Sequence, residues 1–382
     1  MADTQVRRRP VTTSSPAPLL SRRALNRATL ERQSLLSRSA MPVTEAVEHL
    51  VGMQAQTPHT WYTGLWTRLA GFRPEHAADL LTGRRLVRIP LMRSTIHLVS
   101  AADCLALRPV VQPVMERGLN ANFGRDLAGV DREELAAAGR ALVEERPLTF
   151  GALGRLLAER WPGRDPGSLA QAMRAWVPLV QVPPRGLWGR SGPIAHTTAE
   201  SWLGAGVTAE PSPRRMVLRY LAAFGPATVM DIQTWSGLTR LSEVVEALRP
   251  ELLTFRDEEG RELFDLQEAP RPGPDTPAPP RFLYDFDNLL LSHADRRRVV
   301  TEDYHRQAYD RHGPVPQLLL VDGFTGGDWK ITGQRGAAVL TIRPYRPLSG
   351  PDAAAVTEEG ARLLEFAAPD AESHDVRLLP AP

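Results

Sequence analysis

The sequence contains almost no lysine and almost no cysteine. Lys330 is the only lysine, so every other one of the 46 basic side chains is an arginine, and Cys104 is the only cysteine. A single cysteine can form neither an internal disulfide nor a cysteine-rich zinc site, so we expect Cys104 to serve packing. A single lysine also argues against lyase chemistry, which requires an amine to form a Schiff base.

Long apolar runs and a strong net charge are absent as well. No apolar run is long enough to cross a bilayer, and the start, MADTQVRRRPVTTSSPAP, lacks the apolar core of a signal peptide. We therefore expect a cytoplasmic protein without membrane contact. The formal net charge is only +2, so any nucleic acid surface must come from local arginine clusters. The excess of arginine fits a GC-rich genome, yet guanidinium groups also bind phosphate in a bidentate way. Candidate clusters are Arg22 and Arg23, Arg84 with Arg85 and Arg88, Arg214 and Arg215, and Arg296 to Arg298.

Prolines and capping residues divide the chain into short helices. A helix capped by Ser21 is followed by helices that begin at Pro42, Pro58 and Pro74. Two strands, 85–89 and 91–99, then follow and are hinged at Pro90. Several helices followed by a two-stranded ribbon are typical of a winged helix.

The same plan recurs twice, without a clean sequence repeat. One helix pair at 150–161 and 168–177 precedes an irregular proline-rich wing, and three helices between 214 and 248 precede a hairpin at 252–266. We predict an α+β fold, mainly α with β wings. Its parts are a disordered basic arm (1–20), a first winged-helix module (21–100), a helical connector (101–145), a second module (146–205), a third module (206–269), a proline-rich linker (270–280) and a β-rich C-terminal region (281–382).

The segment Gly52-Met-Gln-Ala-Gln-Thr-Pro-His is the strongest candidate for chemistry. Pro58 disfavours an α conformation at Thr57, so the preceding helix must end near Met53. In a locally extended stretch, residues i and i+2 point the same way, so Gln54 and Gln56 can converge on one small volume. The alternative is that both are solvated loop glutamines.

The strand that follows is predicted to be half polar. Alternation over Met92 to Val99 places Arg93, Thr95 and His97 on one face. We expect Arg93 to bind phosphate, whereas His97 contacts either DNA or a neighbouring backbone group. Other arginines expected to contact DNA are Arg85, Arg88, Arg296 and Arg297.

Several stretches together resemble one known family. VGMQAQTPHTWYTGLWTRL followed by LMRSTIHLV, and later RFLYDFDNLLLSHADRRRV and LLLVDGFTGGDWKI, resemble the AlkZ-type DNA glycosylases of the winged-helix superfamily, which carry a Gln-hydrophobe-Gln motif. The resemblance runs from about Leu25 to beyond Lys330. It implies three tandem winged-helix modules that form a C-shaped DNA channel, with Gln54 and Gln56 as catalytic residues. A related YcaQ-like branch carries aspartate at the second motif position, and the small Ala55 departs from the usual larger hydrophobe.

The chemistry that the resemblance implies needs no strong acid. N7-alkylation makes guanine cationic, so the base leaves as a neutral molecule, and amide oxygens suffice to hold water and favour an oxocarbenium-like sugar. We therefore predict a monofunctional DNA glycosylase, monomeric and without metal or cofactor, that acts on double-stranded damaged DNA and leaves an abasic site. Family members with two motif glutamines resemble self-resistance enzymes that remove bulky N7-guanine adducts or unhook cross-links made by a genotoxic antibiotic. The competing hypothesis is a winged-helix regulator that binds DNA without catalysis.

Two further features remain open from the sequence. Asp285 and Asp287 suggest a metal pair, although turn capping or ion pairs with Arg296 to Arg298 explain them as well. The predicted hairpin at 317–332 either probes DNA near the lesion or belongs to the core.

Overall fold

The computed structural model describes residues 17–309, 315–334 and 336–382. Most of the predicted basic arm, 1–16, lies outside these residues. The remainder of the arm is ordered, because the backbone of Arg256 donates to Pro18 at 2.9 Å and accepts from Leu20 at 2.8 Å. These residues therefore extend the edge of a hairpin instead of forming part of a tail.

The N-terminal third alternates short helices with strands. Ser21 caps the first helix by accepting from the backbone of Ala24, and Pro74 lies in the first turn of a later one. The elements are α1 (Arg22–Arg32), α2 (Val43–His49), β1 (Met53–Gln54), α3 (Trp61–Trp66), α4 (Pro74–Thr82), β2 (Leu86–Pro90), the 3₁₀ turn η1 (Met92–Ser94) and β3 (Ile96–Ser100).

Strands of the first and second predicted modules share one sheet. β4 (Leu148–Thr149), β5 (Leu179–Gln181) and β6 (Ala195–Thr198) join the earlier strands in the order β1-β3-β2-β5-β6-β4, with Arg88 of β2 opposite Gln181. Cys104 is buried in the adjoining core, in agreement with the packing role expected for it. The helices of this region are α5 (Ala101–Val110), α6 (Gln112–Phe123), α7 (Arg132–Glu145), α8 (Phe150–Arg160), α9 (Pro166–Trp176) and α10 (Ala199–Leu203).

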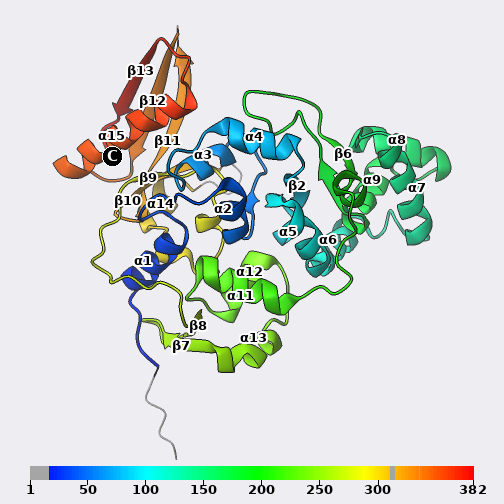
Figure 1. Cartoon of the computed structure of the whole chain (residues 1–382), viewed down its shortest axis with the longest axis horizontal. Coiled ribbons are helices and arrows are strands. Elements are labelled where there is room, and N and C mark those ends of the chain that lie inside the picture. Colours follow the sequence, from blue (N-terminus) through cyan, green and yellow to red (C-terminus); the bar gives the residue numbers. More distant parts are fainter. Residues whose placement is uncertain (1–16, 310–314, 335) are drawn as a thin grey trace, which may run out of the picture.

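The helices and hairpin predicted for residues 214–266 are confirmed. α11 (Pro213–Phe224), α12 (Val229–Ser236) and α13 (Ser242–Leu248) precede the antiparallel pair β7 (Leu252–Arg256) and β8 (Glu262–Leu266). In Figure 1 they lie at the bottom of the molecule, while α7, α8 and α9 lie at its right-hand end. Residues 267–280 contain neither helix nor strand, as expected of a proline-rich linker.

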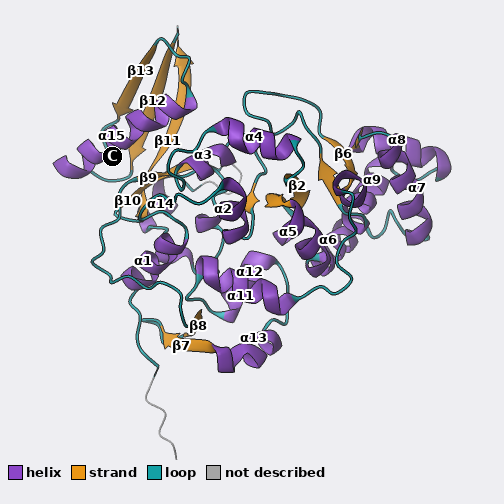
Figure 2. Ribbon diagram, in the orientation of Figure 1, coloured by secondary structure: helices purple, strands orange, loops and turns teal. Residues whose placement is uncertain are grey.

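The C-terminal region combines a sheet with a long helix. Its strands are β9 (Arg281–Phe282), β10 (Gln317–Val321), β11 (Phe324–Gln334), β12 (Ala337–Pro344) and β13 (Ser373–Leu378), in the order β13-β12-β11-β10-β9. The expectation of a β-rich region missed α15 (Gly350–Ala367), which is capped by Ser349 and packs beside this sheet (Figure 2). The shorter elements here are η3 (Asn288–Leu290), η4 (Arg296–Arg298) and α14 (Glu302–Gln307). None of the helices in the described part of the chain is long and apolar enough to cross a membrane.

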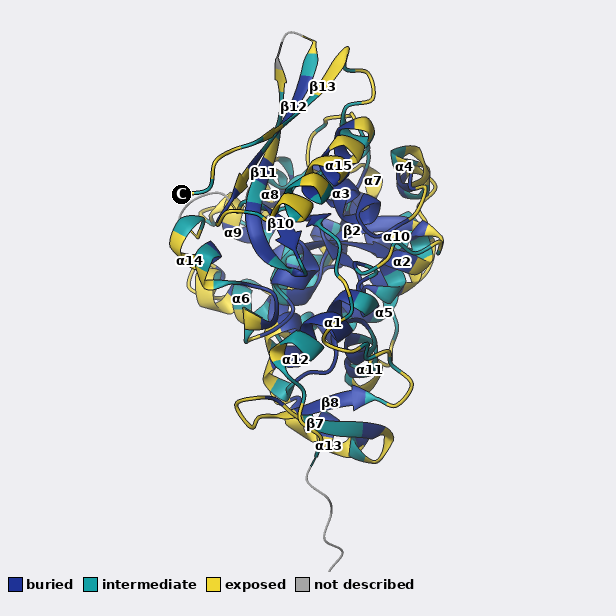
Figure 3. Cartoon of the chain, turned by 90° about the vertical axis from the view of Figure 1, so that its left-hand side faces the viewer, coloured by how far each residue is buried: buried dark blue, intermediate teal, exposed yellow. Residues whose placement is uncertain are grey.

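The segment after β9 is packed against the N-terminal helices. One hydrophobic core contains Met53, Trp61 and Tyr62 together with Phe282 and Tyr284. The strands β1 and β9 are buried, and so is most of β10, the neighbour of β9 in the sheet (Figure 3). Gly64 in α3 permits the close approach, because a Cβ there would lie 2.7 Å from the Tyr284 ring. The N-terminal helices and the C-terminal region thus share one hydrophobic core.

A buried ion pair joins the same two segments. Arg68, just after α3, donates to both carboxylate oxygens of Asp287 at 2.6 and 2.8 Å, and both side chains are at most 2% exposed. Burial alone would lower the pKa of Arg68, but the Asp287 carboxylate more than offsets this, so that the pKa is raised. Asp287 also caps η3 by accepting from Leu289. It therefore pairs with Arg68, not with Arg296 to Arg298, which was one of the readings left open.

Removing one partner of this pair should destabilise the protein strongly. Asp287→Ala leaves the Arg68 guanidinium buried and unpaired, so we expect the free energy of unfolding in urea to fall by about 3–5 kcal/mol. The double variant Arg68→Met with Asp287→Leu should recover most of the loss, because it buries no charge. The control Asp375→Ala removes an exposed partner of Arg377 and should cost less than about 1 kcal/mol. An unfolding curve of Asp287→Ala that overlays the wild type would contradict this role.

Candidate active site

The predicted glutamine elbow starts as a short strand. Val51 and Gly52 have φ values of 54° and 85°, which turn the chain from α2 into β1. Gln54 then pairs with His97 of β3, and the backbone of Ala55 donates to Ile96 at 2.7 Å. The elbow therefore runs along the beginning of β3 before it bends at Gln56.

Gln54 binds the turn η1, and Gln56 binds the first residue of β3, directly after that turn. Oε1 of Gln54 accepts from Nη2 of Arg93 at 2.8 Å, and Oε1 of Gln56 accepts from the backbone N–H of Ile96 at 3.3 Å. Gln54 is 4% exposed, whereas Gln56 is exposed. Because arginine and a backbone N–H only donate, these contacts fix which end of each amide faces the protein.

That turn replaces the start of the strand predicted from Met92. Arg93 and Ser94 have φ values of 55° and 59° and form η1, so alternation begins only at Ile96. Left-handed conformations are uncommon in residues other than glycine and persist where the surroundings impose them. Here Arg174 binds the hydroxyl and the carbonyl of Ser94, and Gly237 packs against the Arg93 backbone, where a Cβ would lie 3.3 Å away.

The guanidinium of Arg93 donates hydrogen bonds to other groups of the protein. Besides Gln54, its guanidinium binds the carbonyl of Trp235. Burial lowers its pKa to about 10, so it remains charged at neutral pH. Arg93 therefore holds Gln54 in place in this structure, and a phosphate contact would require one of these bonds to be exchanged.

Three other residues expected to contact DNA lie inside the protein or within the turn. Thr95 closes the turn by donating to Met92 at 3.1 Å. His97 is 1% exposed, and its Nδ1 donates to the Thr95 carbonyl at 2.9 Å. Arg88 is also 1% exposed and donates to the carbonyl of Ala55 at 2.7 Å, directly beneath the elbow. Direct contact of DNA with Arg88 or His97 would require the surrounding structure to open.

Arg88 and His97 both titrate abnormally because they are buried. Burial, followed by repulsion from Arg185, lowers the pKa of Arg88 to about 10. Its Nε and Nη1 have no hydrogen-bond partner in the part of the chain that the structure describes. Burial and the neighbouring Arg93 lower the pKa of His97 to about 3, so His97 is neutral at physiological pH. It can act neither as a cationic phosphate ligand nor as an acid there.

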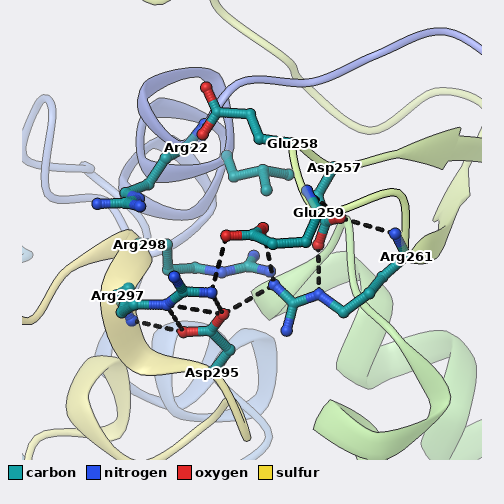
Figure 4. A pocket seen from close by; sticks show the side chains of 9 residues that line it. Arg22, Asp257, Glu258, Glu259, Arg261, Asp295, Arg297 and Arg298 are labelled. Atoms are coloured by element: carbon teal, nitrogen blue, oxygen red, sulfur yellow. Dashed lines mark hydrogen bonds and ion pairs between the residues drawn. The ribbon is translucent and has the colours of Figure 1, made fainter.

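The remaining predicted DNA contacts lie near the surface. Arg85 is exposed and Arg296 is half-buried. Arg297 is exposed but forms ion pairs with Asp295 at 2.6 Å and Glu259 at 2.8 Å, in the charged cluster of Figure 4. The hydrogen bond and charge of Asp295 raise the pKa of Arg297. Much of the positive charge of this cluster is therefore neutralised by acidic neighbours.

Two residues of the segment after β9, which sequence reasoning did not assign to the site, hold the elbow. Asn288 accepts from the backbone of Gln54 at 3.2 Å and donates to the carbonyl of Gly52 at 2.6 Å. Asp285 accepts from the hydroxyls of Thr57 and Thr60. The available signal was the cluster of polar residues in the apolar run RFLYDFDNLLLSH, which lies more than 220 residues away in the sequence.

Comparisons with known proteins identify the family. The family described as DNA glycosylase AlkZ-like matches residues 47–366, a range that contains both the elbow and the segment that holds it. The chain therefore belongs to the AlkZ-like family of DNA glycosylases, which confirms the resemblance found in the sequence.

Two matches to proteins of one bacterium extend over almost the whole chain. An interstrand DNA cross-link repair glycosylase of Streptomyces sahachiroi is 26% identical over 367 residues, which cover 87% of this chain and 93% of that protein. The solved structure of S. sahachiroi DNA glycosylase AlkZ aligns with a TM-score of 0.77 at 23% identity, over 94% of this chain and 100% of that one. The overall fold is thus shared with this structure.

The buried histidines predict how stability depends on pH. The pKa values of His97, His196 and His293 are lowered, in each case chiefly by burial, to about 3, 4 and 3. Near pH 6.5 and below, the unfolded chain binds protons that the folded protein does not, so the free energy of unfolding should fall on acidification from pH 7 to 5. Each histidine contributes a slope of up to about 1.4 kcal/mol per pH unit.

Urea denaturation across this pH range checks the slope. The variant His97→Gln, which removes one titrating group, should show a shallower dependence than the wild type by the contribution of one proton. The same slope in both proteins would show that His97 is not held neutral in the folded state.

Proposed function

We propose that this protein is a monofunctional DNA glycosylase that hydrolyses the N-glycosidic bond of cationic alkylated purines, N7-alkylguanine above all, and leaves an abasic site. The observation that carries the proposal is that Gln54 and Gln56 are both hydrogen-bonded to the short segment 93–96, which consists of the left-handed turn and the start of β3. Preorganised polar groups of this kind act without reorganisation during the reaction.

The two amides suit a reaction in which the substrate is already activated. Each carbonyl oxygen has two lone pairs, so Gln54 and Gln56 retain one for a water molecule or for the dipolar stabilisation of a cationic sugar. N7-alkylguanine needs no protonation to leave, because the bond electrons neutralise its charge. Gln56 is the exposed member and therefore the one accessible to solvent.

The DNA contacts proposed for this chain use arginines at the surface. Of the arginines predicted to contact DNA, Arg85 is exposed and Arg296 is half-buried. Arg297 is exposed too, but it is engaged in ion pairs with Asp295 and Glu259. Phosphate contacts of this kind bind without sequence preference and weaken as salt rises. We further propose that the protein acts as a monomer, and that its helices and hairpins form three winged-helix modules around a DNA channel.

Bulky and cross-linked lesions are the proposed substrate range. The S. sahachiroi relative is named for interstrand cross-link repair, and a cross-link through N7 of guanine carries the same cationic purine. A channel lined by wings would admit such bulk without a closed base pocket. A duplex with one N7-methylguanine tests the basic activity: release of the base with an abasic site supports it, whereas a gel shift without release supports a DNA-binding regulator.

Truncation of each glutamine should slow excision without weakening DNA binding. We expect Gln54→Ala and Gln56→Ala each to lower the single-turnover rate by about 10²-fold to 10³-fold, as for loss of one preorganised polar group. The double variant should lose less than the product of the two factors, because both groups hold the same water. Gln56→Asp, which mimics the related branch, should retain activity that Gln56→Ala lacks.

The matched control is Gln267→Ala, which removes an exposed glutamine after β8 and should excise at the wild-type rate. If both elbow variants are folded and also excise at the wild-type rate, the site lies elsewhere.

A lyase step should be absent. The only lysine, Lys330, is exposed on β11 of the C-terminal sheet, and the proposed site offers no lysine amine that could form a Schiff base. We therefore expect borohydride to trap no covalent complex between the protein and DNA during excision. A trapped complex that disappears in Lys330→Ala would refute the monofunctional assignment.

A further inference from the structure

Asp285 places a carboxylate against the glutamine elbow. It lies just after β9, and its two oxygens accept from two threonines: Oδ2 from the hydroxyl of Thr57, and Oδ1 from that of Thr60 at 2.6 Å. Thr57 directly follows Gln56. The carboxylate is half-buried and so remains accessible to water.

The charge of Asp285 is not neutralised by a basic partner. Asp287, two residues on, is enclosed by the guanidinium of Arg68, but no ion pair among the described residues includes Asp285. The basic groups beside the elbow, Arg88 and Arg93, bind Ala55 and Gln54 instead. A structural anchor for two hydroxyls needs no negative charge, so the charge itself calls for an explanation.

Three titratable groups near Asp285, namely Tyr284, Arg68 and Arg93, cannot take up a proton in its place. The phenol of Tyr284 is kept protonated, because burial, together with the negative charge of Asp287, raises its pKa well above the ordinary value. Arg68 and Arg93 stay protonated at neutral pH, and Asp287 is held by Arg68. Among these groups, Asp285 is the one that accepts hydrogen bonds from the elbow, through the hydroxyls of Thr57 and Thr60.

Hydrolysis releases a proton from the attacking water, and an acceptor within the site speeds its removal. Glutamine amides position water, but they do not take a proton from it at neutral pH. A positioned carboxylate does, and general base catalysis typically contributes a factor of 10² to 10⁴. The hydroxyl of Thr57 donates its hydrogen to Asp285. The lone pairs of the Thr57 oxygen can therefore accept a hydrogen bond from a water molecule.

We propose that Asp285 is the proton acceptor of this site and that the Thr57 hydroxyl relays the proton to it, an inference that rests on the proposed glycosylase function. The water oxygen forms a bond to C1′ of the sugar, while the C1′–N9 bond breaks and its electron pair leaves with the cationic base, which becomes neutral. Thr57 accepts the proton of the water as its own passes to Oδ2 of Asp285. The products are an abasic sugar, a neutral base and a protonated Asp285, which later releases its proton to solvent.

The test compares single-turnover excision of N7-methylguanine from a duplex at saturating protein. We expect Asp285→Asn, which keeps the shape but loses the charge, to slow excision about 10²-fold or more, with the Kd for DNA changed less than about twofold. Thr57→Val should show a similar loss, and Thr57→Ser should restore most of the rate because it restores the hydroxyl.

The matched comparison is Thr60→Val, which removes an equivalent hydrogen bond to the same carboxylate. The relay predicts a loss at least tenfold smaller for Thr60→Val than for Thr57→Val, whereas a structural anchor predicts similar losses. A second readout is chemical rescue. Added formate should accelerate Asp285→Ala about tenfold and leave the wild type unchanged, and this result is expected even where Asp285→Asn folds poorly.

The outcomes separate this inference from the function on which it rests. If the wild type excises the base while Asp285→Asn keeps its rate, or if Thr57→Val and Thr60→Val lose rate equally and formate has no effect, the relay is overturned and the glycosylase assignment stands. If the wild type releases no base, the proposed function itself fails, and the relay fails with it.

Discussion

The arrangement of the elbow depends on the buried ion pair between Arg68 and Asp287. This pair joins the end of α3 to the segment after β9, two parts of the chain that are 219 residues apart. Because a buried charge without its partner is costly, the pair leaves little freedom for either segment to shift. The neighbouring residues Asp285 and Asn288 are thereby presented to the elbow, where they bind Thr57, Thr60 and the backbone of Gln54. A glutamine pair that relies on orientation alone requires this kind of support.

A second constraint acts from the opposite side of the elbow. The turn at Arg93 and Ser94 is left-handed at two residues other than glycine, a conformation that costs about 1–3 kcal/mol at each. Contacts from α9 and α12 hold this turn, and the turn and the start of β3 hold both glutamines. The strained turn lowers the stability of the fold and at the same time fixes the orientation of the two side-chain amides. The buried guanidinium groups of Arg88 and Arg93 bind Ala55 and Gln54, and the carboxylate of Asp285 binds Thr57 and Thr60, so the elbow is held by charged groups of both signs.

Local signals predicted those parts of the molecule that local chemistry determines. Pro58 predicted the break between α2 and α3, although α2 ends at His49 instead of near Met53 and α3 begins at Trp61 instead of at Pro58. Turn residues predicted the β7–β8 hairpin. The turn at Arg93 could not be predicted, because no glycine marks it and contacts with Arg174 and Gly237 impose it. Alternation of polar residues suggested instead that the strand began at Met92.

The partners of the elbow were hidden from the sequence for a different reason. The roles of Asp285 and Asn288 follow from long-range packing of β9 against α3, which no periodicity reveals. From the sequence, Asp285 and Asp287 suggested a metal pair, a capped turn or ion pairs with Arg296 to Arg298. In the structure Asp287 caps η3 and pairs with Arg68, and Asp285 binds the elbow. The sequence likewise could not show that Arg88 is buried while Arg85 is exposed, because the two are only three positions apart in the same basic cluster.

The central claim is that the elbow surrounds the sugar at which the bond breaks. A duplex in which a cationic pyrrolidine replaces the target deoxyribose carries a positive charge where the oxocarbenium develops, and a crystal structure of its complex with this protein locates that charge directly. The account predicts the pyrrolidine nitrogen, or a water bound to it, within hydrogen-bond distance of the side-chain oxygens of Gln54 and Gln56. A well-ordered complex with the pyrrolidine bound elsewhere and both glutamines facing bulk solvent would contradict it.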